Sequence, residues 1–214
     1  MKAPDFIPAL VQLLLTLGQL RSPQGDAAMR TILMSGPPAR LRFDAAISGL
    51  RSREVDFLDQ LVNDPICTTD KAEHAPLVSG LARAITLDRL ASRLDALLGL
   101  VARRKTGDWQ QIAMLDGMIS TLPAPPKDGR STGSAPKVIR FPSEPAGWAG
   151  VKKLTEAEVQ TRVARLEPLL AWPGHNDAAL PKVVPLSAAE QESFVRGKDL
   201  YGAICAACHQ PHGD

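Results

Sequence analysis

Apolar residues recur at helical spacing through most of the first 122 residues. The clearest run predicts a helix over residues 87–104, with Thr86 placed to cap its first turn. Its apolar residues are three and four positions apart and form one stripe: Leu87, Leu90, Ala91, Leu94, Leu97, Leu98 and Val101. A stripe of this kind is typical of a helix that buries one face in a protein core.

The same periodicity predicts further helices on both sides of this run. They cover residues 8–20, 26–34, 39–50, 54–62, 73–84 and 109–122. The turn-forming sequence Asn63-Asp64-Pro65 ends the second pair of helices. The last helix begins a fourth pair whose second member the sequence does not show.

These helices follow an internal repeat. A glycine occurs near the end of the first helix of each pair, at positions 18, 49, 80 and 117, which gives spacings of 31, 31 and 37 residues. Helix pairs that recur with such a period are typical of α-solenoids. The pattern resembles HEAT-type repeats. The sequence therefore predicts an all-α protein in which residues 1–122 form an α-solenoid of HEAT-like helix pairs.

Residues 123–150 form a Pro/Gly/Ser-rich linker by composition, with a short extended segment at 138–141 and irregular chain over 142–150. Residues 151–186 are expected to hold a connecting helix and a spacer. The pair Thr155 and Glu158 predicts a capping box at the start of this helix, and Trp172-Pro173-Gly174 predicts its end. Its expected apolar face consists of Val159, Val163, Leu166, Leu169 and Leu170.

Composition supports a helical core and excludes two kinds of partner. The chain is 44% hydrophobic but only 4% aromatic, which favours helices over sheet. The net charge of +2, without a basic patch interleaved with aromatic residues, argues against a nucleic-acid partner. No apolar run approaches the ~18 residues that a membrane-spanning helix needs. The repeat region also shows no His, Asp, Glu or Ser residues at catalytic spacing, so no catalytic constellation is expected in it.

The candidate chemistry lies at the end of the sequence, in Cys205-Ala206-Ala207-Cys208-His209. Cys-x-x-Cys-His is the attachment pattern of a c-type haem. Two thiols at this spacing reach the two vinyl groups on one edge of a porphyrin, and the adjacent imidazole reaches the iron. The predicted haem-binding residues are therefore Cys205, Cys208 and His209, with His209 as the iron ligand.

Two other interpretations of these cysteines stay open. A zinc site could use Cys205, Cys208 and His212, and would need a fourth ligand from Cys67, His74 or His175. A redox dithiol is the second possibility, but a histidine directly after Cys208 favours haem over both. Cys67, the remaining cysteine, is expected to be a small buried hydrophobic residue.

The residues before this motif strengthen the haem interpretation. Ser187 and Glu190 predict a capping box that opens a helix over residues 188–203, and Phe194, Gly197, Tyr201 and Ile204 share one of its faces. With Gly197-Lys198-x-Leu200-Tyr201, residues 187–214 resemble the start of a class I cytochrome c domain. The resemblance implies thioether bonds at Cys205 and Cys208 and a proximal iron ligand at His209. Members of that family continue further and supply a second axial ligand, so this domain is expected to be incomplete.

The order of the parts resembles large bacterial haem-binding proteins described as membrane-bound dehydrogenases, in which a β-propeller and HEAT-like repeats precede a cytochrome c domain. This resemblance implies electron transfer through haem c, with the repeats as scaffold and a redox protein or an upstream dehydrogenase module as partner. Because the repeat region has no catalytic constellation, the chain itself is expected to be at most the electron-transfer module of a dehydrogenase. Haem c is attached outside the bacterial inner membrane, so a periplasmic or other extracytoplasmic location is expected. Residues 1–20 are expected to belong to the first repeat helix and not to a signal peptide, so an export signal is expected upstream of residue 1. The alternative is an α-solenoid that binds protein partners without a functional haem.

Overall fold

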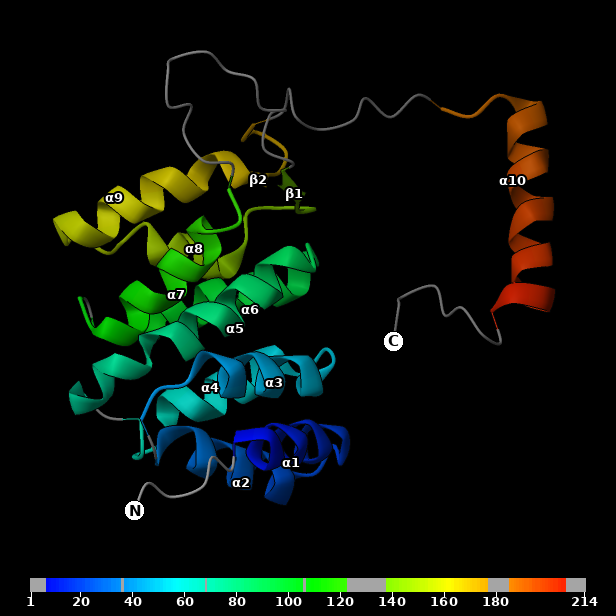
Figure 1. Ribbon diagram of the computed structural model, residues 1–214. Coiled ribbons are helices and arrows are strands. Elements are labelled where there is room, and N and C mark those ends of the chain that lie inside the picture. Colours follow the sequence, from blue (N-terminus) through cyan, green and yellow to red (C-terminus); the bar gives the residue numbers. More distant parts are fainter. Residues whose placement is uncertain are drawn as a thin grey trace, which may run out of the picture. The chain divides into compact units, whose positions relative to one another are not determined.

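The computed structural model describes residues 7–35, 37–67, 69–105, 107–122, 138–176 and 185–206. The chain divides into two compact units, Met1–Leu180 and Pro181–Asp214 (Figure 1). The described residues are mostly helical and include only two short strands, which confirms the all-α expectation.

The first unit consists of a succession of helices with one small sheet. The helices are α1 (Ile7–Gln19), α2 (Pro23–Met34), α3 (Arg40–Leu50), α4 (Glu54–Asn63), α5 (Ala75–Leu87), α6 (Ala91–Arg103), α7 (Trp109–Ile119), α8 (Ala146–Val151) and α9 (Ala157–Leu166). Short 3-10 segments η1 (Thr69–His74) and η2 (Glu167–Leu169) lie before α5 and after α9. Strands β1 (Ile139–Arg140) and β2 (Leu170–Ala171) pair in parallel, with Ile139 opposite Leu170.

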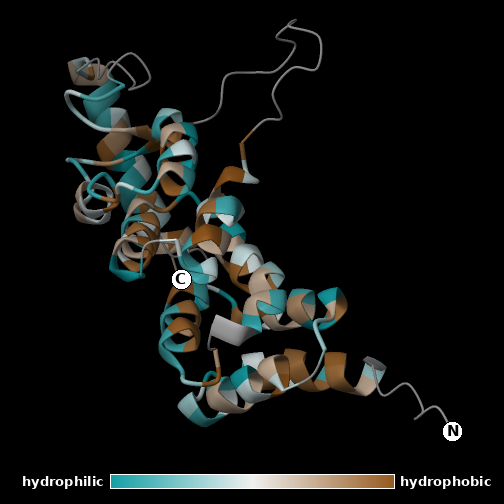
Figure 2. Cartoon of the chain, turned by 90° about the vertical axis from the view of Figure 1, so that its left-hand side faces the viewer, coloured by the Kyte–Doolittle hydropathy of each residue, from teal (hydrophilic) through white to brown (hydrophobic). Residues whose placement is uncertain are grey.

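The helices of this unit pack in two series. Helix α1 packs on α3, α3 on α5, α5 on α7 and α7 on α9, while α4 packs on α6 and α6 on α8 (Figure 1). Each helix carries both hydrophobic and hydrophilic residues, as Figure 2 shows, and apolar side chains are buried between the helices. Fully buried leucines come from successive helices: Leu14, Leu33, Leu50, Leu58, Leu81, Leu97 and Leu115.

The four glycines of the predicted repeat lie where successive helices of the first series meet. A Cβ on Gly18 would come within 2.6 Å of the carbonyl carbon of Gly49. A Cβ on Gly80 would lie 2.8 Å from Ile47 Cδ1, and one on Gly117 would collide with a backbone carbonyl of α5. The glycines therefore share one role, because each lets two helices approach more closely than a larger side chain would permit.

Two similar ion pairs link the starts of helices α2, α4 and α6. Arg53, directly before α4, lies 2.6 Å from the carboxylate of Asp26 in the first turn of α2. Arg93, in the first turn of α6, pairs with Glu54, the first residue of α4. Both carboxylates are buried. One pair links the start of α2 to the start of α4, and the other links the start of α4 to the start of α6.

The helix predicted over residues 87–104 begins later than expected. Helix α5 continues to Leu87, and Arg89 then takes a left-handed backbone conformation (φ 58°) before α6 starts. Thr86 is buried inside α5, where its hydroxyl donates to a carbonyl one turn earlier, so it caps nothing. Leu87 and Leu90 are half-exposed and Ala91 is partly buried, whereas the other four residues of the stripe are fully buried: Leu94, Leu97, Leu98 and Val101.

The segment predicted to be irregular over residues 142–150 contains helix α8, so that prediction is wrong. Its Trp148 is buried, and Gly147 N donates a hydrogen bond to Asp95 Oδ1 of α6 over 2.7 Å. A helix this short has too few positions to show periodicity, and its packing on α6 stabilises it. The extended segment predicted at 138–141 is confirmed as β1.

All five residues of the predicted apolar face are buried, but Leu169 and Leu170 lie beyond the end of α9, and both predicted ends of this helix are wrong. The N-cap residue is Glu156, without a side-chain cap, and the predicted capping box between Thr155 and Glu158 does not form. The helix ends at Leu166, well before Trp172, because the following residues form η2 and then pair with β1 as strand β2.

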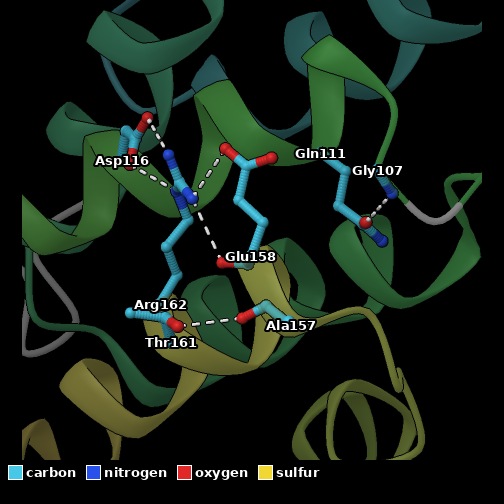
Figure 3. A network of polar contacts seen from close by, with 7 residues as sticks. All are labelled: Gly107, Gln111, Asp116, Ala157, Glu158, Thr161 and Arg162. Atoms are coloured by element: carbon cyan, nitrogen blue, oxygen red, sulfur yellow. Dashed lines mark hydrogen bonds and ion pairs between the residues drawn. The ribbon is translucent and has the colours of Figure 1, made fainter.

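An arginine explains why that capping box is missing (Figure 3). Arg162 Nη1 lies 3.1 Å from Glu158 Oε1, and Arg162 Nε lies 2.7 Å from Asp116 Oδ1 of α7. The Glu158 carboxylate therefore binds the guanidinium of Arg162, one turn later in the helix, and not a backbone N–H at the helix start. The hydrogen bond to Asp116 is the largest cause of a raised pKa of the Arg162 guanidinium.

Candidate haem-attachment segment

The second unit contains helix α10 (Ala188–Leu200), which begins with the predicted capping box. Ser187 N donates to Glu190 Oε2 over 2.8 Å, and Glu190 N donates to Ser187 Oγ over 3.4 Å. Hydrogen bonds from the hydroxyl and then from the backbone N–H of Ser187 lower the pKa of the Glu190 carboxyl. This prediction is confirmed, and the capping box fixes where the helix that leads to the cysteine motif begins.

Helix α10 continues directly into a wider turn, η4 (Tyr201–Cys205). Ala206 N donates to the carbonyl of Tyr201 over 2.9 Å, which is the i to i+5 bond of a π-type turn. Cys205 is the last residue of this turn, and its side chain is exposed. The first thiol of the motif is therefore accessible at the end of a continuous helical segment.

Apolar side chains of this segment are solvent-exposed. Phe194 is 58% exposed and Ile204 is 70% exposed. Together with Gly197 and Tyr201 they occupy positions three and four residues apart, which places them on one face of the helix. A Cβ on Gly197 would meet no atom of the described residues within 4 Å, so none of them packs closely against this position. The segment thus presents an apolar face that stays open to solvent.

The structure places one of the three predicted haem-binding residues. Cys208 and His209 lie outside the described residues, as does His212, so their roles stay predictions. Cys205 belongs to the second unit, whereas Cys67, His74 and His175 belong to the first.

Cys67 is buried, as predicted. Gln110 Nε2 donates to the Cys67 carbonyl over 2.6 Å and lies 3.3 Å from its Sγ. Burial is the main reason that the pKa of the Cys67 thiol is raised to about 11, and the bond from Gln110 opposes that rise. A thiol held in this way stays protonated at neutral pH and is a poor metal ligand or nucleophile.

The two histidines of the first unit have structural surroundings. His74 is buried, with its Nδ1 3.4 Å from Glu73 Oε1 and its ring beside that of Phe43. His175 stacks on Trp172 with 4.0 Å between ring centres, in a tight turn closed by backbone hydrogen bonds between the two residues. Within the described ranges, no group of three or more His, Cys, Asp or Glu side chains is close enough to hold a metal ion.

The first unit also has a hollow of about 930 Å³ between α3 and α5. Phe43, Ile47 and Gly80 contribute apolar surface to it, and Arg40 and Arg83 contribute charge. Asp44 is the one carboxylate among its described lining residues.

None of the helices in the described ranges has the length and apolar character needed to cross a bilayer. No protein family, curated protein or solved structure matches the chain.

Proposed function

We propose that the chain carries electrons through a haem c bound covalently by Cys205 and Cys208, with His209 as the proximal iron ligand. The observation that carries the proposal is the exposed Cys205 thiol, the first residue of a Cys-x-x-Cys-His sequence, at the end of a continuous helix. A thioether forms only where the sulfur can reach the vinyl group. When bound, the haem supplies one-electron chemistry through its iron.

The apolar face that precedes Cys205 fits such a group. A porphyrin is large and mainly apolar, and the exposed Phe194 and Ile204 lie on the helix face that leads to the attachment point. Ala206 leaves space directly after the first cysteine. These residues would contribute apolar contacts to the ring, while His209 would contribute the ligand that tunes the iron.

In this proposal the first unit is an α-solenoid of HEAT-like helix pairs that positions the haem against a partner. Support comes from the equivalent glycines of the first helix series and from the equivalent ion pairs, Asp26 with Arg53 and Glu54 with Arg93. The partner would be a redox protein or a dehydrogenase module of the same polypeptide. Because haem c is attached on the outer side of the bacterial inner membrane, the protein would work in an extracytoplasmic compartment.

The test is expression of the gene that encodes this chain in a bacterial periplasm equipped for haem c maturation. The expected product gives a pyridine haemochrome spectrum with one haem per chain, and the haem stays attached in a denaturing gel. Cys205→Ser and Cys208→Ser should each weaken covalent attachment, and the double variant should abolish it. Cys67→Ser is the control and should retain the haem, since Cys67 is buried in the first unit.

A colourless product with the thiols of Cys205 and Cys208 still titratable would overturn the proposal. It would leave the second candidate, an α-solenoid that binds protein partners without a functional haem. One observation favours that candidate, namely that the described core cluster is built entirely from residues between Leu14 and Trp172. Stoichiometric zinc that is lost on Cys205→Ser would instead assign the motif to a zinc site.

A further inference from the structure

The contacts along the first helix series are not equally close. Where α1 meets α3, at Gly18 and Gly49, and where α7 meets α5, at Gly117, a glycine lies against the backbone of the neighbouring helix. Where α3 meets α5, a Cβ placed on Gly80 would approach the end of the Ile47 side chain but no backbone atom of α3 within 4 Å. The hollow of about 930 Å³ lies at this wider contact.

The hollow is a groove between one face of α3 and one face of α5 (Figure 1). The lining residues of this α3–α5 groove recur three and four positions apart, from Arg40 to Ser48 on α3 and from Pro76 to Leu87 on α5. Residues spaced in this way share one face of a helix. The stretch of α5 is about 16 Å long, which equals roughly three turns of an α-helix.

The floor of the α3–α5 groove is apolar, and its middle has little side-chain bulk. Among the lining residues of α3, Phe43 is buried and Ile47 is half-buried. The middle of the α5 face consists of small residues, Ser79, Gly80 and Ala84. A third helix can pack into such a space, because its side chains fill the groove that two neighbouring helices leave between them.

The groove has an arginine toward each end. Helices α3 and α5 run in the same direction, since Arg93 after α5 pairs with Glu54 after α3. Arg40 lies seven residues before the α3 residue that contacts Gly80, and Arg83 lies three residues after Gly80 on α5. The two positions are therefore separated by about 15 Å along the groove.

Neither positive charge is firmly compensated. Arg83 is exposed and makes no hydrogen bond or ion pair with any residue that the structure describes. Arg40 lies 3.7 Å from Asp44, and the high exposure of both side chains (94% and 62%) makes this pair weak. With two guanidiniums and one carboxylate among its described lining residues, the groove is net positive.

The positions of the two arginines limit what can occupy the groove. A small anion could touch both only if the two side chains extended fully toward each other, and it would then lie on the apolar floor, where a charge is costly. A ligand that satisfies both arginines is elongated, with negative groups at its ends and apolar groups between them. An amphipathic helix of about three turns has this length and places such groups on one face.

We propose that the α3–α5 groove binds an amphipathic helix of a partner protein, which carries carboxylates about three turns apart and apolar residues between them. The carboxylates pair with Arg40 and Arg83, since guanidinium groups bind carboxylates with two parallel hydrogen bonds. The apolar residues cover Ile47 and Leu87. Nothing in this groove depends on the cysteine motif, so the proposal and haem binding can fail independently of each other.

The test uses the whole chain and a fluorescent helical peptide with leucines along one face and a glutamate at each end of that face, about three turns apart. Binding, followed by fluorescence anisotropy, should weaken with salt. Arg83→Gln should weaken binding of this peptide about fivefold. A second peptide with glutamine in place of both glutamates should bind the parent chain and Arg83→Gln within about twofold of each other, because it cannot use the charge.

Ser48→Trp tests where the peptide binds, because Ser48 is an exposed lining residue and the larger ring would fill the groove. This variant should bind the glutamate peptide about tenfold more weakly. The matched controls are Arg165→Gln and Ala164→Trp, at two exposed positions of α9, and each should keep the affinity within about twofold. Denaturant titration checks folding. If Ser48→Trp unfolds early, Arg83→Gln still decides the question, since it loses no contact with a described residue.

Four results would overturn the proposal. Equal losses in Arg83→Gln and Arg165→Gln would reduce the effect to net charge. Unchanged binding in a folded Ser48→Trp chain would place the peptide outside the groove. Equal binding of a peptide with a central proline, which interrupts the helix, would exclude a helical partner. Dimers of the chain alone in sedimentation, abolished by Ser48→Trp and unaffected by the peptide, would assign the groove to a second copy.

Discussion

Gly18 of α1 and Gly49 of α3 lie backbone against backbone. A Cβ on Gly18 would come within 2.6 Å of the Gly49 carbonyl carbon, and one on Gly49 would lie 3.3 Å from Gly18 Cα. A side chain larger than hydrogen at Gly18 would therefore fit only if one of the two helices moved. Close packing of two backbones therefore explains the glycine at this point of the repeat.

Replacing these glycines should have graded effects on stability. Gly18→Ala and Gly117→Ala should each lower the free energy of unfolding by about 1–3 kcal/mol, because the added methyl meets backbone that cannot move aside. Gly80→Ala should have a smaller effect, since the obstacle is the end of the flexible Ile47 side chain. Denaturant titration of each variant measures these changes in the free energy of unfolding.

The matched control is Gly197→Ala in α10, where an added Cβ would meet nothing within 4 Å. Alanine in a helix interior is favoured over glycine by about 0.5–1 kcal/mol. Hydrogen exchange of the α10 backbone amides should therefore be slower in Gly197→Ala than in the parent chain. If Gly18→Ala unfolded at the same denaturant concentration as the parent chain, the α1–α3 contact would not be as close as described.

The ion pair between Asp26 of α2 and Arg53 should be sensitive to loss of its carboxylate. Asp26→Ala would leave Arg53 partly buried without its partner and should cost about 2–3 kcal/mol of unfolding free energy. Asp44→Ala is the comparison, since Asp44 pairs with Arg40 at 3.7 Å in full exposure and should cost about 0.5 kcal/mol or less. Thermal unfolding monitored by circular dichroism distinguishes the two, and equal melting temperatures would contradict the assignment.

The two cysteines that the structure describes should differ in thiol reactivity. In chain prepared without haem, and with Cys208→Ser to simplify the measurement, Cys205 should react quickly with Ellman's reagent at pH 8. Cys67 should react only on unfolding, because it is buried and its pKa is raised to about 11, which leaves roughly 0.1% thiolate at this pH. A fast reaction of both thiols in the folded chain would contradict this burial.

The same pKa predicts how stability depends on pH. The folded-state pKa of the Cys67 thiol lies above its ordinary value of 9.0, so the folded chain retains a proton that the unfolded chain has lost. The stabilisation is fully present below pH 9 and should be lost as the pH rises toward 11. Cys67→Ala should remove this decline, which repeated denaturant titrations across the range would reveal.

The start of α10 should loosen in acid. The pKa of Glu190 is lowered by its bonds from Ser187, so its contribution is present above the ordinary carboxyl pKa of 4.5 and is lost as the pH falls through the lowered value. Amide exchange in the first turn of α10 should therefore accelerate in acid. Ser187→Ala should weaken this dependence, whereas Thr155→Ala should leave the start of α9 unchanged because no capping box forms there.

These two sites show how far a local pattern can predict structure. Both Thr155-x-x-Glu158 and Ser187-x-x-Glu190 have the sequence of a capping box, but only the second forms one. In α9, Arg162 binds Glu158 and also Asp116 of α7, a residue 46 positions away. Local sequence offers a capping partner, and a distant charge determines whether it is used.

The sequence by itself determined the helical class, the equivalence of the four glycines and the chemistry available at Cys205, because periodicity and covalent reactivity depend on residue identity and local spacing. Only the tertiary structure decided that Gly18 meets Gly49 and that residues 146–151 form a helix. Those features depend on which distant segments pack together. Packing is the sum of many weak contacts over the whole unit, which no single stretch of sequence contains.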